Sequence, residues 1–162
     1  MVKSGEKGLK MLIGNYSSKL DLEKGRTALP KKFRQLLGKK IIITAGYEKS
    51  LMIISHSSWE KVAGGIVNRP FISGSARETD RFLLGSAFEI ELDIQGRFII
   101  PQSLRSHAGL SGDIVFVGVG NRIEVWDYAG WEKHQKYLAE NIEKIAKKLD
   151  EIPSTSTFKT NN

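Results

Sequence analysis

The sequence predicts a compact, barrel-like, β-rich α+β fold built from two copies of one repeat, followed by a long C-terminal helix. The first observation is an internal repeat, because residues 11–34 and 82–105 carry the same special residues at a constant offset of 71. The second is that short apolar runs alternate with turn residues, as in compact folds of short strands. The matched pairs are Gly25/Gly96, Arg26/Arg97, Pro30/Pro101 and Arg34/Arg105.

Each repeat is expected to begin with a strand, a tight hairpin turn at its Gly-Arg pair and a very short second strand. Glycine suits such a turn because it adopts positive φ without steric cost. The proline that follows is typical of the first position of a helix, where no backbone N–H is required. The expected strands cover 15–21, 27–29, 86–93 and 98–100, and the expected helices cover 30–37 and 101–108, which end near Gly38 and Gly109.

A strand–turn–strand unit and then a helix that carries tryptophan complete each repeat. The expected strands cover 41–45, 51–54, 114–118 and 122–126. Ser55 and Asp127 are candidate N-caps of the two helices that follow. The last helix, about 128–151, places an apolar residue at every seventh position, as in an amphipathic stripe of nearly coiled-coil character. Two interpretations stay open for this stripe: packing on its own domain, or contact with another subunit.

The repeat sets the expected domain boundaries. A short helix is expected at Arg77–Leu84, leading into the second repeat. The polar ends of the chain are expected to be disordered. The segments are a disordered extension (1–10), the first repeat (11–67), a linker (68–81), the second repeat with its C-terminal helix (82–150) and a disordered tail (151–162).

Positive charge is concentrated at the N-terminal end of the chain. The net charge is +7, but residues 1–40 alone contain eleven Lys or Arg against three acidic residues. Such a localised positive field is typical of a surface that binds a polyanion. A solvated lysine-rich surface is the alternative that charge alone leaves open.

Several classes of protein are excluded or disfavoured by what the sequence lacks. It contains no cysteine, and its three histidines lack the spacing of metal ligands. It has no phosphate-binding glycine loop and no nucleophile motif, so we expect neither an enzyme nor a cofactor, metal or small-molecule substrate. No apolar run is long enough to cross a bilayer, so no membrane partner is expected. The lack of cysteine and of a signal peptide favours a cytoplasmic protein.

The doubled motif Gly-Arg-x-x-x-Pro-x-x-x-Arg supplies the candidate DNA-binding residues. Arginine carries five donors in a fixed fork that suits phosphate and the guanine edge, and a two-stranded β-ribbon fits the major groove. The first copy has lysines where the second has Gln95, Gln102 and Ser103, so charge assigns DNA contact mainly to the first repeat. The candidates are Arg26, Lys24, Lys31, Lys32 and Arg34 in the first repeat, and Arg97 and Arg105 in the second.

Two acidic residues precede the motif arginines. Asp93 lies four residues before Arg97 and is placed to hold its guanidinium, whereas Asp21 lies five residues before Arg26. Lys31, Lys32 and Arg34 lie near the start of a short helix, and their expected role is phosphate contact, which adds affinity without sequence information.

The two Asp…Gly-Arg…Pro…Arg segments, the 77–84 lead-in and the Leu-Arg-Ser-His-Ala-Gly-Leu stretch at 104–110 resemble the MraZ family of bacterial regulators, in the AbrB/SpoVT class of swapped-hairpin folds. The resemblance covers about residues 11–150. It implies two pseudo-symmetric halves that form one double-split β-barrel-like unit, and ring-like homo-oligomers of it. These would bind G-rich direct repeats in double-stranded DNA upstream of the cell-division and cell-wall genes, generally as repressors. Such a DNA-binding protein is expected to be associated with the nucleoid. The family's Asp-x-x-x-Arg motif matches Asp93–Arg97 directly. In the first repeat it requires one inserted residue, because Leu22 stands where the acid is expected.

Two alternatives remain beside this prediction. One is an AbrB-like transition-state regulator or antitoxin, although such chains usually carry one motif and a separate partner-binding tail. The other is an oligomeric interaction module whose basic face meets an acidic protein or membrane surface. Preference for a repeated G-rich duplex over scrambled DNA separates a specific regulator from the second alternative.

Overall fold

The computed structural model describes residues 11–151 in two units that are considered separately. The first unit holds all strands and the shorter helices, and the second consists of the long helix α6 (Tyr128–Leu149). The segments 1–10 and 152–162, for which the sequence predicts disorder, lie outside the described residues. The α+β, β-rich class with a long C-terminal helix is the predicted one.

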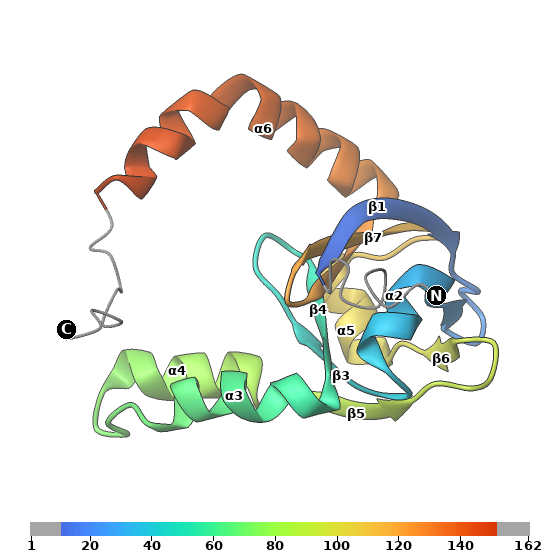
Figure 1. Cartoon of the computed structure of the whole chain (residues 1–162), viewed down its shortest axis with the longest axis horizontal. Coiled ribbons are helices and arrows are strands. Elements are labelled where there is room, and N and C mark those ends of the chain that lie inside the picture. The colour runs from blue at the N-terminus through green and yellow to red at the C-terminus, as the bar shows by residue number, and fades with distance from the viewer. Residues whose placement is uncertain (1–10, 152–162) are drawn as a thin grey trace, which may run out of the picture. The chain divides into compact units, whose positions relative to one another are not determined.

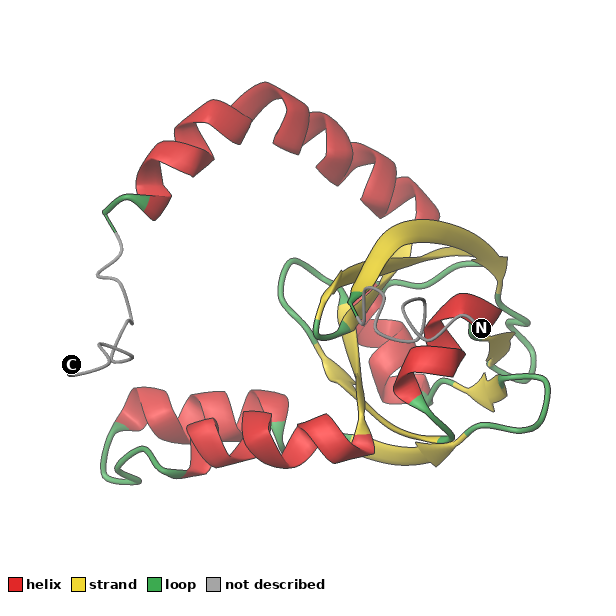
Figure 2. Ribbon diagram, viewed as in Figure 1, coloured by secondary structure: helices red, strands yellow, loops and turns green. Residues whose placement is uncertain are grey.

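A six-stranded antiparallel sheet curls around two short helices in the first unit (Figures 1 and 2). Its edges are formed by the first strand of each repeat. In spatial order the strands are β1 (Leu12–Lys19), β7 (Asp113–Gly120), β8 (Ile123–Asp127), β4 (Leu51–Ser55), β3 (Lys40–Ala45) and β5 (Phe88–Glu91). The two remaining strands, β2 (Arg26–Ala28) and β6 (Arg97–Ile99), form a separate two-stranded ribbon.

Every contact between the repeats in these sheets is reciprocal. The first strand of each repeat pairs with the third strand of the other, β1 with β7 and β5 with β3. The fourth strands pair with each other, β4 with β8, and so do the second strands, β2 with β6. Neither repeat therefore forms a complete sheet alone, and the two interleave into one barrel-like unit.

The prediction that the two strands flanking each Gly-Arg turn pair with each other is wrong. The turns are present, but in the first repeat only an isolated bridge, Asp21 to Arg26, joins the two arms of the turn. The three-residue strands β2 and β6 instead pair with each other. A three-residue strand forms few hydrogen bonds to its neighbour. It is therefore most stable beside a partner strand that also buries its inward-facing side chain. That partner is the equivalent strand of the other repeat.

The core lies between the concave face of the sheet and helices α2 (Lys31–Leu37) and α5 (Gln102–Ala108). Each helix contributes two buried residues, Phe33 and Leu37 from α2 and Leu104 and Ala108 from α5. Burial of each large side chain contributes about 1.5–3 kcal/mol relative to its exposed state. Because these helices occupy equivalent places in the two repeats, the pseudo-symmetry extends to the core.

Both helices begin one residue later than predicted and end where predicted. Pro30 and Pro101 have extended ψ angles of 139° and 145°, so they occupy the N-cap and not the first helical position. Gly38 and Gly109 are the C-caps with positive φ, as the sequence indicates.

Helices α3 (His56–Val67) and α4 (Gly74–Leu83) form an antiparallel pair beside β3 (Figure 1). Ser55 is the N-cap of α3, as predicted, and accepts a hydrogen bond from the Ser58 N–H. Helix α4 begins inside the predicted linker, three residues before the expected Arg77. The Thr44 hydroxyl donates to the Leu83 carbonyl at 2.6 Å, which attaches the end of α4 to β3.

Helix α6 has 22 residues, none of them buried. Asp127, the predicted N-cap, directly precedes the helix, and its carboxylate accepts hydrogen bonds from the N–H and the hydroxyl of Ser111. Among the residues that the structure describes, none of the helices combines the length and apolar character needed to cross a membrane.

Candidate nucleic-acid interface

The ribbon formed by β2 and β6 presents both motif arginines on one exposed face. Its register pairs Thr27 with Phe98 at the centre, and both of these side chains are buried. Side chains alternate between the two faces of a strand, so the residues on either side of this pair point outward. Arg26 faces Ile99 and Arg97 faces Ala28 across the ribbon, at positions related by the pseudo-twofold axis between the repeats.

A shallow hollow of about 430 Å³ lies on this face, lined by both arginines. The carboxylates of Glu91 and Asp93 also line it. An open hollow flanked by guanidinium groups does not enclose a drug-sized ligand, but it is accessible to the phosphates and base edges of a duplex. The two arginines are therefore presented together.

The Arg97 loop, residues 93–97, is held together by the Asp93 carboxylate. One oxygen accepts backbone N–H bonds from Gln95 at 2.9 Å and Arg97 at 2.8 Å. The other oxygen accepts from the Arg97 Nε at 2.7 Å. The backbone and guanidinium hydrogen bonds from Arg97 lower the pKa of Asp93 below its usual value. The Asp-x-x-x-Arg spacing thus forms the closed pair that the sequence indicates.

The Arg26 loop, residues 21–26, also begins with an aspartate that binds backbone N–H groups, but this aspartate does not bind the arginine side chain. The Asp21 carboxylate accepts N–H bonds from Glu23 at 3.0 Å and Lys24 at 3.3 Å, so it closes the turn. It makes no side-chain hydrogen bond or ion pair with Arg26. Within residues 11–151 the exposed Arg26 guanidinium has no hydrogen-bond or ion-pair partner, and its donors are available to a ligand. The extra residue in this loop separates the acid from the arginine.

The predicted lysines lie at the surface beside the Arg26 loop. Lys24 is exposed within the loop, and Lys31 and Lys32 are exposed in the first turn of α2, which follows β2 after two residues. The equivalent residues of the second repeat are exposed and neutral: Gln95, Gln102 and Ser103. The difference in charge noted in the sequence is therefore a difference between two exposed surfaces.

The remaining two predicted arginines are placed differently. Arg34 and Arg105 are partly buried behind the loops, and each contacts the loop of the opposite repeat. The Arg105 Nε donates to the Ile100 carbonyl at 2.9 Å. Both side chains belong to the same site as Arg26 and Arg97, but they form part of its support.

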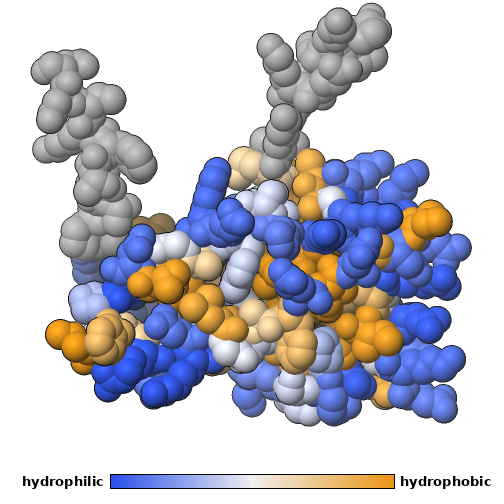
Figure 3. Space-filling model, turned by 90° about the horizontal axis from the view of Figure 1, so that it is seen from below, coloured by the Kyte–Doolittle hydropathy of each residue, from blue (hydrophilic) through white to orange (hydrophobic). Residues whose placement is uncertain are grey.

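Exposed apolar residues at the interface were missed by the sequence-based prediction. Ile94, in the Arg97 loop, is 93% exposed, Leu22 in the Arg26 loop is 57% exposed, and Ile99 on the ribbon is 53% exposed. An apolar residue at a turn position is the only signal in the sequence that identifies the first two. Phe71 and Ile72, which lie in the α3–α4 connection, are each 78% exposed. Figure 3 shows apolar side chains at the surface among hydrophilic ones.

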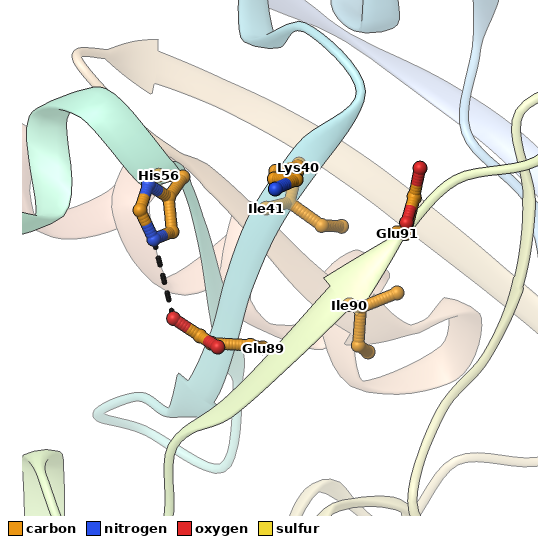
Figure 4. Close-up of a pocket in the computed structure, with 6 residues that line it drawn as sticks. All are labelled: Lys40, Ile41, His56, Glu89, Ile90 and Glu91. Atoms are coloured by element: carbon orange, nitrogen blue, oxygen red, sulfur yellow. Dashed lines mark hydrogen bonds and ion pairs between the residues drawn. The ribbon is translucent and has the colours of Figure 1, made fainter.

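A second hollow, of about 270 Å³, lies between β3 and β5 (Figure 4). The His56 Nε2 lies 3.2 Å from a Glu89 carboxylate oxygen, and Lys40 and Glu91 flank the pair. Among residues 11–151 no group of three or more histidine or acidic side chains is placed to hold a metal ion. This hollow brings together charges of both signs and contains no candidate nucleophile, so the ribbon carries the stronger site.

Comparison with known proteins agrees with the doubled motif. Residues 11–82 and 83–152 each match the family described as "MraZ protein, putative antitoxin-like". The chain is 37% identical over 142 residues to the transcriptional regulator MraZ of Thermoanaerobacter sp. (strain X514), covering 88% of this chain and 99% of that protein. It is 39% identical over 140 residues to the protein of the same name from Caldanaerobacter subterraneus subsp. tengcongensis, covering 86% and 97%.

A third relative shows a similar level of identity. The transcriptional regulator MraZ of Leuconostoc citreum is 38% identical over 139 residues, covering 86% of this chain and 96% of that protein. The family comprises transcriptional regulators and not enzymes, which is the class that the sequence predicts. Both the repeat and the full-length similarity lead to the same assignment: the chain belongs to the MraZ family of transcriptional regulators.

Proposed function

We propose that this chain regulates transcription by sequence-specific binding to double-stranded DNA, which it reads with Arg26. The unpaired Arg26 guanidinium on the exposed ribbon carries the proposal. Its five donors are free to bind the O6 and N7 acceptors of guanine in a bidentate manner. Lys24, Lys31 and Lys32 surround this position with charge that neutralises phosphates.

The proposed operator is a set of G-rich direct repeats upstream of a cell-division and cell-wall gene cluster, where binding represses transcription. A ring-like homo-oligomer repeats the Arg26 loop, so that neighbouring protomers engage successive DNA repeats. Linked contacts of this kind raise the overall affinity by orders of magnitude above that of a single site. A nucleoid-associated protein in the cytoplasm follows from the same proposal.

The test is a fluorescence anisotropy titration of the full chain with a G-rich direct-repeat duplex and a scrambled duplex of equal composition. Titrations at several salt concentrations separate the phosphate contribution from base recognition. We expect tighter binding to the repeat at every salt concentration, with the preference retained as the nonspecific affinity falls. Equal affinity for both duplexes across the salt series rejects the proposed function. Measurement of the particle mass in parallel tests the ring.

A further inference from the structure

Two arginines of the short helices cross from one repeat to the loop of the other. Arg105, at the end of the second repeat's motif, lies against Gly25 in the first: a Cβ added to Gly25 would lie 2.8 Å from the Arg105 Cζ. The Arg105 Nη1 also lies 3.5 Å from the Leu22 carbonyl oxygen. One guanidinium therefore touches the Arg26 loop at its start and at its glycine.

Arg34 makes the reciprocal contact. A Cβ added to Gly96 would lie 2.7 Å from the Arg34 Nη1 and 2.8 Å from its Cδ. Backbone hydrogen bonds repeat the exchange, because the Leu29 N–H donates to the Gly96 carbonyl and the Ile100 N–H donates to the Gly25 carbonyl, both at 2.9 Å. Each loop is thus attached to the segment that precedes the helix of the opposite repeat.

We propose that Arg34 and Arg105 are positioning residues that hold the Gly-Arg loop of the opposite repeat, and not phosphate contacts. This inference rests on the proposed DNA-binding function and assigns a different role to two of its residues. We call the pair the crossed arginines. Both are partly buried, whereas the phosphate candidates Lys31 and Lys32 are exposed.

The chemistry of the contact favours arginine and glycine together. The planar guanidinium of each arginine lies close to a glycine, which has no side chain. The Arg105 Nε also donates to the Ile100 carbonyl oxygen. Both glycines also have positive φ, +72° at Gly25 and +77° at Gly96, which other residues rarely adopt. The motif Gly-Arg-x-x-x-Pro-x-x-x-Arg therefore contains both halves of the contact, but each half serves the other repeat.

The crossed arginines are unequal. The Arg105 guanidinium donates a hydrogen bond to Ile100 and reaches the Leu22 carbonyl, whereas the Arg34 guanidinium makes no hydrogen bond or ion pair with any residue between 11 and 151. The Arg26 loop, which lacks an acid–arginine pair, is the loop that Arg105 holds. Loss of Arg105 is therefore expected to affect DNA reading more than loss of Arg34.

Hydrogen exchange on the full chain without DNA tests the crossed contact independently of DNA binding. Mass spectrometry follows two segments, 20–27 and 92–98, in the variants Arg105→Ala and Arg34→Ala. Loss of a hydrogen bond from a charged donor is expected to raise local exchange by roughly tenfold. Arg105→Ala should raise exchange in segment 20–27, and Arg34→Ala should raise it, by a smaller factor, in segment 92–98.

The crossed pattern is the decisive result. A rise confined to the helix that carries the substitution, or an equal rise in both loops, overturns the proposal. If Arg105→Ala loses its fold, as judged by exchange in the core strands β3 and β7, the variant Arg105→Lys decides. Lysine keeps the charge and an aliphatic stem but lacks the planar fork, so segment 20–27 should still exchange faster than in the unmodified chain.

DNA binding then separates positioning from phosphate contact. For Arg105→Ala we expect a loss of preference for the repeat duplex with an unchanged salt dependence, and Arg105→Lys should not restore the preference. A phosphate contact predicts the reverse: a salt slope about one unit smaller for alanine, and rescue by lysine. Lys32→Ala is the matched control for that reduced slope. If the unmodified chain lacks preference for the repeat, the proposed function fails, while the exchange pattern still decides on the crossed arginines.

Discussion

The Arg26 loop and the Arg97 loop share one sequence motif, but only the Arg97 guanidinium is paired with the aspartate of its own loop. In the Arg97 loop, Asp93 binds the guanidinium and two backbone N–H groups, so the loop is closed from within. In the Arg26 loop, Asp21 binds only backbone, and Arg105 of the other repeat supports the loop from outside. One inserted residue accounts for this difference, because it moves the acid out of the register in which it pairs with the arginine.

The comparison indicates how a duplicated unit can divide its roles without a change of fold. A loop that is stabilised by its own arginine has fewer donors of that arginine left for a ligand. A loop that is stabilised by a residue from elsewhere keeps its arginine available. The exposed lysines of the first repeat, where the second repeat has neutral residues, follow the same division.

The largest expected effect comes from removal of the two motif arginines. Arg26→Ala should weaken binding to the repeat duplex by about 1–3 kcal/mol, roughly 5- to 150-fold, because a bidentate guanine contact is lost. Arg97→Ala should weaken it less. Anisotropy titrations measure both, with Arg69→Ala in the α3–α4 connection as a control of equal charge. A greater loss for Arg97→Ala would reverse the assigned roles.

The next effect concerns stability and the crossed contact. Gly25→Ala should destabilise the fold by more than the roughly 1–2 kcal/mol expected for a non-glycine residue in the left-handed region, because its Cβ also displaces Arg105. Gly109→Ala is the matched control, since Gly109 has φ +57° and no neighbouring atom within 4 Å of an added Cβ. Chemical denaturation compares the two, and equal losses would mean that Arg105 adjusts freely.

Deletion of Leu22 tests whether the length of the loop decides if Arg26 pairs with Asp21. The shortened loop has the Asp-x-x-x-Arg spacing, so Asp21 should pair with Arg26 and compete with DNA. An exposed pair of this kind contributes about 0.2–1 kcal/mol, so affinity should fall by up to roughly fivefold. Addition of Asp21→Asn to the deletion should restore part of the affinity. Failure of that second change to restore any affinity would assign the loss to the altered turn.

The lysines of α2 should affect affinity without specificity. Lys31→Ala or Lys32→Ala should reduce binding to repeat and scrambled duplexes by the same factor, because phosphate contacts carry no sequence information. The slope of log affinity against log salt concentration should fall by about one unit for each contact that is lost. Gln102→Ala, at the equivalent place in the second repeat, should leave the slope unchanged. A selective loss for the repeat duplex would place a lysine at the bases.

The smallest effect is the pH response of the Arg97 loop. The pKa of Asp93 is held below its usual value by hydrogen bonds to Arg97, so the ionised form stabilises the folded loop. This contribution is complete above the ordinary aspartate value near 3.8 and is lost as the pH falls through the lower folded pKa. Carboxyl NMR titration should show this, and Arg97→Ala should bring the pKa of Asp93 back toward 3.8. An unchanged titration in that variant would assign the shift to the backbone alone.

Much of the local structure was predictable from the sequence, because it depends on neighbouring residues. The strand runs, the turns at Gly25 and Gly96, the short helices after each proline and the Ser55 cap all follow from local preferences. The exposed positions of Arg26 and the lysines follow from polarity and the motif. The start of α4 at Gly74 differs from the prediction, because Ser73 caps the helix ahead of the expected Arg77.

The strand pairing was not predictable in the same way. The sequence places β1 beside β2 along the chain, and a hairpin is the pairing that local turn chemistry favours. In the fold, β2 pairs with β6 because Thr27 and Phe98 are buried together at the pseudo-twofold axis. The roles of Arg34 and Arg105 depend on this exchange, since each guanidinium lies against the turn glycine of the opposite repeat.

The sequence by itself determined the repeat, the elements of each half, the family and the charge difference between the two loops. These are properties of residue order, and they do not depend on how the halves meet. Only the tertiary structure decided which arginine is free and which residues support each loop. The physical reason is that a guanidinium is held or released by partners that come from the other repeat or from a one-residue change in loop register.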